Sequence, residues 1–154
     1  KNGTIIIHLN YKKKLSNLEK KTFLNEINNF LELGYKIIFI YPIPHLDQNV
    51  SEKIYKIFKT SNEHLQNYLS NYENYISVDY LQFKKDSNHI SKFLSSISHK
   101  NLYSIYPHNV FCSKKKCFGH SKNDIFYVDG SHLSKIGSNL VNKELLNIIN
   151  KIYK

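Results

Sequence analysis

The chain has 154 residues and a formal net charge of +10, because 22 basic residues outnumber 12 acidic ones. Its length suits one domain with a single hydrophobic core. All 22 basic residues are lysine, whereas nucleic-acid-binding surfaces normally use arginine for bidentate contacts to phosphates and guanines. No apolar run approaches the ~20 residues that a membrane-spanning helix needs. The composition therefore argues against a nucleic-acid-binding protein and against a membrane span within these residues.

The first part of the sequence predicts a strand, a helix and a second strand. Residues 4–9 and 35–41 are continuous apolar runs rich in β-branched side chains, which is typical of strands buried on both faces of a parallel sheet. Residues 17–33 between them carry apolar side chains at helical spacing, and Gly34 follows where a helix C-cap is expected. This order is a βαβ unit, whose crossover is right-handed almost without exception.

The rest of the sequence predicts further helices and one more strand of the same sheet. The predicted elements are a helix over 51–68, irregular structure with one short extended piece over 72–83, a helix capped by Asp86 or Ser87 and running to Ile97, a strand over 102–106, a short extended piece over 125–127 and a helix from about Lys135. Neither an internal repeat nor a linker divides the sequence. The expected class is therefore α/β, with a parallel sheet layered against helices.

Cys112 and Cys117 flank a Ser-Lys-Lys-Lys sequence, and three interpretations of them stay open. A disulfide would close a small loop and imply an oxidising compartment. Two free thiols are the second interpretation. A Cys2His2 metal site with His108 and His120 is the third, although a single C-x4-C pair lacks the second pair that zinc sites usually have.

The sequence Asp129-Gly130-Ser131-His132 places a carboxylate and an imidazole three residues apart. Serine hydrolases and acyltransferases need an imidazole that takes a proton from a hydroxyl, and a carboxylate that orients this imidazole. If the turn is catalytic, one carboxylate oxygen of Asp129 should lie within about 3.2 Å of Nδ1 of His132. The same sequence also suits an ordinary turn before a helix, with His132 as a loop histidine.

A longer stretch carries a family resemblance. The cysteine pair, then Ile125-Phe126-Tyr127-Val128-Asp129-Gly130-Ser131-His132-Leu133-Ser134 and Gly137, resemble the C-terminal block of SGNH-type hydrolases. They resemble in particular the SGNH domain fused behind membrane acyltransferase-3 proteins, which O-acylate cell-surface glycans. The order of predicted elements is also similar over nearly the whole chain. The resemblance implies a three-layer α/β/α fold of SGNH or flavodoxin-like type, incomplete at the N-terminus, with residues 1–154 as the C-terminal part of a single domain.

The resemblance also implies roles for individual residues. His132 would be the general base, Asp129 its orienting partner, and Cys112–Cys117 a structural disulfide. Asn10 follows the first predicted strand, where the wider superfamily places an oxyanion-hole asparagine. An asparagine at the end of a strand is also a common turn former, so both interpretations of Asn10 stay open.

The nucleophile is the point at which the chain departs from the family. The family's nucleophilic serine lies in a Gly-Asp-Ser turn, and no Gly-Asp-Ser occurs among the 154 residues. Ser131 and Ser134 lie too close to His132 in sequence to serve it easily, and both are predicted to cap the last helix. We therefore expect the nucleophile, with the first strand of the domain, to precede Lys1. The present chain should then be inactive by itself and should leave apolar side chains exposed along its sheet.

The implied activity is serine-dependent O-acyl transfer or ester hydrolysis on cell-surface glycans. The implied partners are a glycan acceptor such as peptidoglycan or lipopolysaccharide, and an upstream membrane acyltransferase domain that supplies the acyl group, with no nucleic acid, cofactor or metal. The implied location is periplasmic or extracytoplasmic, with a tether to the inner membrane. The alternative is a non-catalytic, lysine-rich α/β domain that binds carbohydrate or polyanions and keeps the turn for structure.

Overall fold

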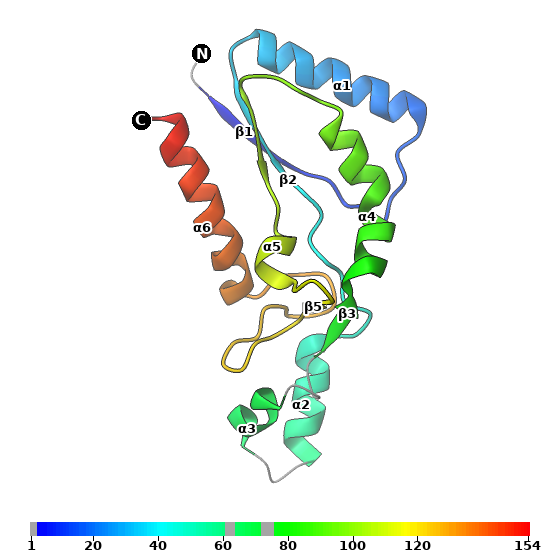
Figure 1. Ribbon diagram of the computed structural model, residues 1–154, viewed down its shortest axis with the longest axis vertical. Helices are drawn as coiled ribbons and strands as arrows, with labels where there is room; N and C mark the ends of the chain where they lie inside the picture. Colours follow the sequence, from blue (N-terminus) through cyan, green and yellow to red (C-terminus); the bar gives the residue numbers. More distant parts are fainter. Residues whose placement is uncertain (1–2, 61–63, 72–75) are drawn as a thin grey trace. The chain divides into compact units, whose positions relative to one another are not determined.

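Three parallel strands form one sheet in the order β1–β2–β4. They are β1 (Thr4–His8), β2 (Lys36–Ile40) and β4 (Leu102–Ile105) (Figure 1). Ile38 lies between Ile6 and Tyr103 in the register of the sheet. All three strands were predicted from their apolar runs, and a parallel sheet flanked by helices confirms the predicted α/β class.

The computed structural model describes residues 3–60, 64–71 and 76–154. The chain divides into two compact units. The first, called the sheet unit below, holds the residues up to Ile43 together with Lys84–Pro107. The second, called the turn unit, holds Pro44–Phe83 together with His108–Lys154.

Helix α1 (Asn17–Glu32) of the sheet unit has clear sequence signals at both ends. Ser16 and Glu19 form a capping box, in which each side chain accepts the backbone N–H of the other residue. Gly34 has a φ of 84° just beyond the helix, a conformation that favours glycine. These two features explain why the predicted ends of this helix agree with the observed ends to within one residue.

The core of the sheet unit lies around β2, where Ile37, Ile38 and Phe39 are completely buried. The ring of Phe23 from α1 packs against the ring of Phe39, with centroids 6.2 Å apart. It also packs against the ring of Phe93 from helix α4 (Tyr80–Ser95), with centroids 5.6 Å apart. In the order β1–β2–β4, each later strand adds to the same side of the sheet. Because parallel crossovers are right-handed, α1 and α4 both pack on the face that carries Phe39.

Strand β1 is at the edge of the sheet in the described part of the chain, where it pairs with β2 alone. Ile6, at its centre, is 46% exposed. The expected strip of exposed apolar side chains is thus represented on β1 by Ile6 alone, and a single exposed apolar residue is common on protein surfaces, so the incomplete domain stays a prediction.

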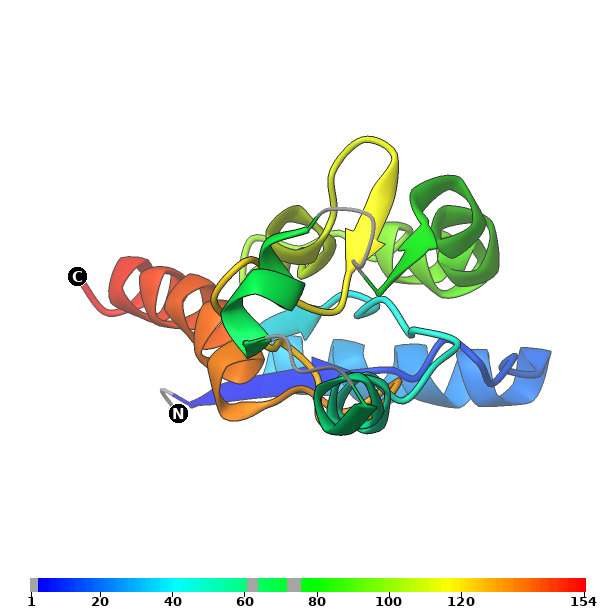
Figure 2. The same ribbon diagram turned by 90° about the horizontal axis from the view of Figure 1, so that it is seen from below.

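The turn unit contains a two-stranded antiparallel sheet of β3 (Ser77–Asp79) and β5 (Lys116–Phe118), seen side by side in Figure 2. Its helices are α2 (Val50–Thr60), α3 (Leu65–Ser70), α5 (His108–Phe111) and α6 (Lys135–Ile152). Phe111 and Tyr127 form its centre, with ring centroids 5.7 Å apart and both side chains buried. Among the helices of the described ranges, none combines the length and the apolar character needed to cross a membrane.

Two predicted helix boundaries are wrong. The single helix expected over 51–68 ends at Thr60, and a separate helix begins at Leu65 after His64 adopts an extended conformation. The expected cap at Asp86 or Ser87 lies inside α4, which begins at Tyr80, and Ser87 is only 2% exposed. Residues 61–63, and 72–75 of the segment predicted to be irregular, lie outside the described residues.

Candidate active site

The Asp129–His132 turn brings its carboxylate and its imidazole into direct contact. Nδ1 of His132 lies 2.7 Å from Oδ2 of Asp129, within the distance expected of a catalytic pair. The carboxylate can only accept, so the proton of the neutral imidazole lies on Nδ1 and the lone pair lies on Nε2. The His132 side chain is 77% exposed, so the ring is open to solvent rather than packed in the interior.

The second carboxylate oxygen of Asp129 holds the backbone of the turn. Oδ1 accepts the backbone N–H of His132 at 2.7 Å and that of Ser131 at 2.6 Å. These two backbone hydrogen bonds, followed by the bond to the His132 ring, keep the pKa of Asp129 well below its usual range. Asp129 is therefore an anion near neutral pH, and its charge can stabilise an imidazolium that forms during a reaction.

Close backbone contacts fix the position of the turn within its unit. The N–H of Val128 donates to the carbonyl of His132 at 2.9 Å, and the N–H of Leu46 donates to the carbonyl of Gly130 at 2.7 Å. A Cβ atom on Gly130 would collide with the Leu46 carbonyl oxygen and lie 3.1 Å from that of Gln48. Gly130 is therefore required by the approach of another backbone segment, which explains the glycine inside the Asp-x-x-His sequence.

The two serines beside His132 have different roles. Ser134 is the N-cap of α6, as predicted, since its hydroxyl accepts the N–H of Gly137 at 3.1 Å and donates to the carbonyl of Ile125 at 2.6 Å. Ser131 does not cap this helix, contrary to the prediction. Its hydroxyl lies 3.2 Å from Oδ1 of Asp129 and 3.3 Å from Nδ1 of His132, on the carboxylate side of the ring.

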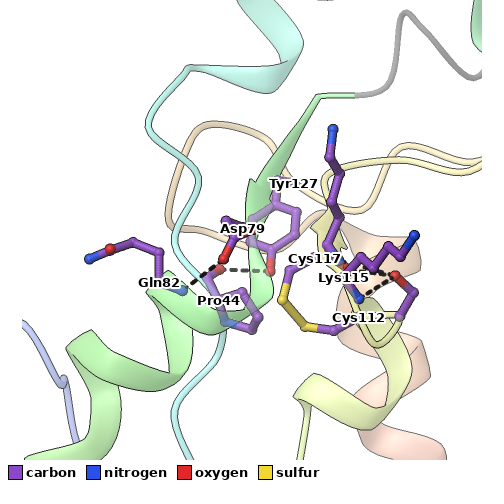
Figure 3. Close-up of a disulfide and its surroundings, with 9 residues drawn as sticks. Pro44, Asp79, Gln82, Cys112, Lys115, Cys117 and Tyr127 are labelled. Atoms are coloured by element: carbon purple, nitrogen blue, oxygen red, sulfur yellow. Dashed lines mark hydrogen bonds between the residues drawn. A yellow bond between two sulfur atoms is a disulfide. The ribbon is translucent and has the colours of Figure 1, made fainter.

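Tyr127 connects the turn to the interior of the turn unit, a support that the sequence analysis missed. Its ring is completely buried and its hydroxyl donates to the carbonyl of Pro44 at 2.8 Å (Figure 3). The Tyr127 carbonyl accepts the hydroxyl of Ser51 at 3.3 Å. The sequence signal for this support is a tyrosine two residues before the aspartate. The signal is insufficient, because a buried phenol needs a hydrogen-bond partner that only the fold can identify.

Cys112 and Cys117 are joined in a disulfide, drawn in Figure 3 beside Tyr127 and Pro44. Their Cα atoms are 3.8 Å apart, closer than the 4.4–6.8 Å usual for disulfides, because the two residues lie directly opposite each other across a tight hairpin. The bond contradicts the free-thiol interpretation.

The disulfide also removes the thiolates that a Cys2His2 metal site would require. His120 is completely buried, with Nδ1 facing the carbonyl of Ser121 at 3.0 Å and Nε2 accepting the N–H of Ile76 at 3.3 Å. Both ring nitrogens of His120 are thus occupied by backbone groups. The parts of the chain that the structure describes contain no cluster of three or more metal-ligating side chains.

Asn10, the oxyanion candidate, belongs to the sheet unit and is exposed. Its side-chain oxygen accepts the backbone N–H of Lys12 at 2.9 Å. This bond is the one expected of an asparagine that forms a turn after a strand. It does not by itself prevent the side-chain amide group from donating a hydrogen bond to a ligand.

The fold is thus an α/β fold with a parallel sheet, and the candidate site is a rigid Asp-x-x-His turn before a helix. The family model of the SGNH domain (fused to AT3 domains) matches residues 3–147, so the chain belongs to this family. This confirms the family resemblance of the stretch from Cys112 to Gly137.

A solved structure gives the same picture of the fold. The chain is similar to the periplasmic domain of a lipopolysaccharide acetyltransferase of Salmonella ser. Paratyphi A, with 20% sequence identity and a TM-score of 0.50. The match covers 98% of this chain but only 57% of that chain, so the present sequence spans little more than half of that domain. At this identity, the likeness shows the fold. A search of curated protein sequences found no match.

Proposed function

We propose that this chain is the base-bearing part of a serine-dependent O-acyltransferase or esterase that acts on cell-surface glycans. The observation that carries the proposal is the 2.7 Å contact between Nδ1 of His132 and the Asp129 carboxylate, with the ring exposed. Membership of a family of SGNH domains fused to acyltransferase-3 domains supports this class of reaction.

His132 takes and returns one proton in each half of the proposed reaction. In the first half, Nε2 takes the proton of the serine hydroxyl as the serine oxygen attacks the acyl carbonyl carbon. The imidazolium then returns this proton to the leaving group, and an acyl-enzyme remains. In the second half, Nε2 takes a proton from a sugar hydroxyl or from water, which attacks the acyl-enzyme, and the serine leaves with that proton. Asp129 stays ionised throughout and stabilises the imidazolium.

The nucleophilic serine of this proposal lies in a segment that precedes Lys1. The Gly-Asp-Ser sequence of the family does not occur in the 154 residues. Ser131 lies on the Nδ1 side of the ring, whereas the nucleophile must approach Nε2. A serine outside residues 1–154 is therefore a simpler source of the nucleophile than Ser131.

The proposed location is extracytoplasmic, with the acyl group delivered by a membrane acyltransferase domain upstream. The disulfide supports this location, because disulfides persist mainly in oxidising compartments. A family description that names fusion to AT3 domains supports the membrane partner. The acceptor in this proposal is a surface glycan such as peptidoglycan or lipopolysaccharide.

The test compares the 154-residue chain with an extended protein, meaning the same chain with its natural upstream segment. Hydrolysis of p-nitrophenyl acetate should be saturable in the extended protein and lost in its His132→Ala variant. His64→Ala is the matched control, since His64 is exposed and its side chain makes no cap hydrogen bond. Equal turnover in the His132→Ala and His64→Ala variants would contradict the proposal.

A further inference from the structure

The turn unit contains a polar hollow beside the disulfide, whose lining residues do not include the Asp129–His132 turn. Its volume is about 330 Å³, at the lower end of the range for small-molecule sites. The residues that line it are Tyr80, His108, Asn109, Cys112, Ser113 and Lys114. We infer that this hollow binds a sugar unit bearing a carboxylate or a phosphate, as a subsite for the glycan acceptor. This inference rests on the proposed function.

One wall of the hollow is aromatic. The rings of Tyr80, Phe83 and His108 form a cluster with centroids 6.1–6.4 Å apart. Phe83 is buried, whereas Tyr80 and His108 are partly exposed and line the hollow. A pyranose ring has an apolar face of C–H groups, and aromatic rings provide the complementary surface for it. Phe83 supports the two lining rings from the interior.

The rest of the wall offers polar groups suited to sugar substituents. The side chain of Asn109 is exposed and carries both donors and an acceptor, so it can pair with neighbouring hydroxyls. Within the described ranges, no hydrogen bond or ion pair occupies the Asn109 amide or the Lys114 ammonium group. Ser113 has a structural role instead, because its hydroxyl accepts the N–H groups of Lys115 and Lys116.

Covalent and hydrogen-bonded links hold these walls in place. The Cys112–Cys117 disulfide closes the hairpin that carries Ser113 and Lys114 (Figure 3). The N–H of Tyr80 donates to the carbonyl of Lys115 at 2.9 Å, which joins the aromatic wall to the hairpin. A site that is already formed loses less conformational entropy on binding than a flexible one.

The charge around the hollow favours an acidic ligand. Residues 108–123 contain four lysines and no acidic residue, and three of these lysines are consecutive at 114–116. The one carboxylate of β3, that of Asp79, does not line the hollow, and its Oδ1 accepts the N–H of Gln82 at 3.0 Å (Figure 3). Lysine acts as a compact point charge that suits a carboxylate or phosphate in varied orientations. A neutral sugar would leave this charge unused.

The direct test is a titration of the ¹⁵N-labelled 154-residue protein, followed by amide chemical shifts. The probes are galacturonate and glucose 6-phosphate, which carry the two kinds of acidic group, with galactose and glucose as their neutral counterparts. We expect the acidic sugars to shift the amides of Tyr80 and residues 108–114, and to bind about five-fold or more tightly than the neutral ones. At least one of the two acidic probes should meet this expectation.

Variants identify the groups responsible. Lys114→Gln should weaken binding of the acidic sugar about five-fold, and Asn109→Ala should weaken acidic and neutral sugars alike. Lys122→Gln is the matched control, because Lys122 is exposed and does not line the hollow. The inference would be overturned if both acidic sugars bound no more tightly than their neutral counterparts, or if the shifts were confined to other residues. It would also be overturned if inorganic phosphate bound as tightly as the tighter of the two acidic sugars.

The outcomes also separate this inference from the proposed function. If the 154-residue protein binds acidic sugars at the hollow but the extended protein transfers no acyl group to a sugar or to water, the proposed function fails and the hollow remains a saccharide site. If the extended protein acylates an acidic glycan and Lys114→Gln leaves its KM unchanged, the proposed function stands and the subsite assignment fails.

Discussion

His132 makes two hydrogen bonds to Asp129, one through its ring and one through its backbone. Nδ1 of the ring lies 2.7 Å from Oδ2, and the N–H of the same residue donates to Oδ1 at 2.7 Å. One carboxylate thus orients the imidazole and fixes the turn that carries it. Replacement of Asp129 should therefore change both the chemistry and the local structure, and the two effects can be measured separately.

Asp129→Asn in the extended protein should lower kcat strongly, by about 10³- to 10⁴-fold if the residue acts as triad aspartates do. The amide cannot stabilise the imidazolium, and its NH₂ group can favour the wrong tautomer of His132. Steady-state kinetics with p-nitrophenyl acetate measure the change. Glu144→Gln, which removes an exposed carboxylate on α6, should leave kcat within two-fold. A similar loss in both variants would show that the effect is not specific to the turn.

The stability contributed by Asp129 should depend on pH in one direction. Its pKa in the folded protein is depressed from an ordinary value of 3.8, chiefly by the backbone N–H of His132. The contribution is therefore fully present above about pH 4 and is lost as the pH falls further and the carboxylate is protonated. Below about pH 4, the difference in unfolding free energy between the wild type and Asp129→Asn should shrink as the pH falls, and urea unfolding at several pH values measures it. A difference that grows between pH 4 and pH 2 would contradict this.

Gly130→Ala should destabilise the protein by about 1–3 kcal/mol, the usual cost of overpacking a site that cannot relax. The new Cβ would meet the backbone carbonyls of Leu46 and Gln48, which cannot rotate away as a side chain can. Chemical denaturation gives the change in free energy of unfolding. Asn139→Ala, at an exposed position of α6, should change this free energy by less than about 0.5 kcal/mol.

Removal of the disulfide should cost about 2 kcal/mol of unfolding free energy, because the loop between Cys112 and Cys117 is short. The paired Cys112→Ser and Cys117→Ser variant should show this loss in urea unfolding. Dithiothreitol should destabilise the wild type by a similar amount and should leave the double variant unchanged. Equal stability of the oxidised and reduced wild type would argue against a contribution of this bond to folding.

The sheet and its neighbouring helix could be predicted because their signals are local. Continuous apolar runs identify the strands around Ile5, Ile38 and Tyr103, since strands buried on both faces need no polar alternation. Gly34 marked the end of α1 through its conformation. The start of α4 was missed because Lys84 to Asn88 are polar and resemble a loop, whereas the fold buries Ser87 within the helix.

The candidate site likewise has a local part, which the sequence predicts, and nonlocal supports, which it does not predict. The contact between Asp129 and His132 follows from a spacing of three residues, so a local pattern was sufficient to predict it. The supports of the turn come from distant residues: Leu46 donates to Gly130, and Pro44 accepts the hydroxyl of Tyr127. The pairing of β3 with β5 is likewise nonlocal and only three residues long. Sequence patterns carry little information on such contacts, because neither partner has a distinctive local composition.

The location of the acyl group decides whether His132, oriented by Asp129, serves a serine outside residues 1–154, as we propose. Pre-steady-state kinetics with p-nitrophenyl acetate, followed by mass spectrometry, locate this group. We expect a burst from the extended protein, with the acyl group on a serine that precedes Lys1, and no burst from its His132→Ala variant or from the 154-residue chain. A burst from the 154-residue chain, with the acyl group on one of its own serines, would refute the proposal.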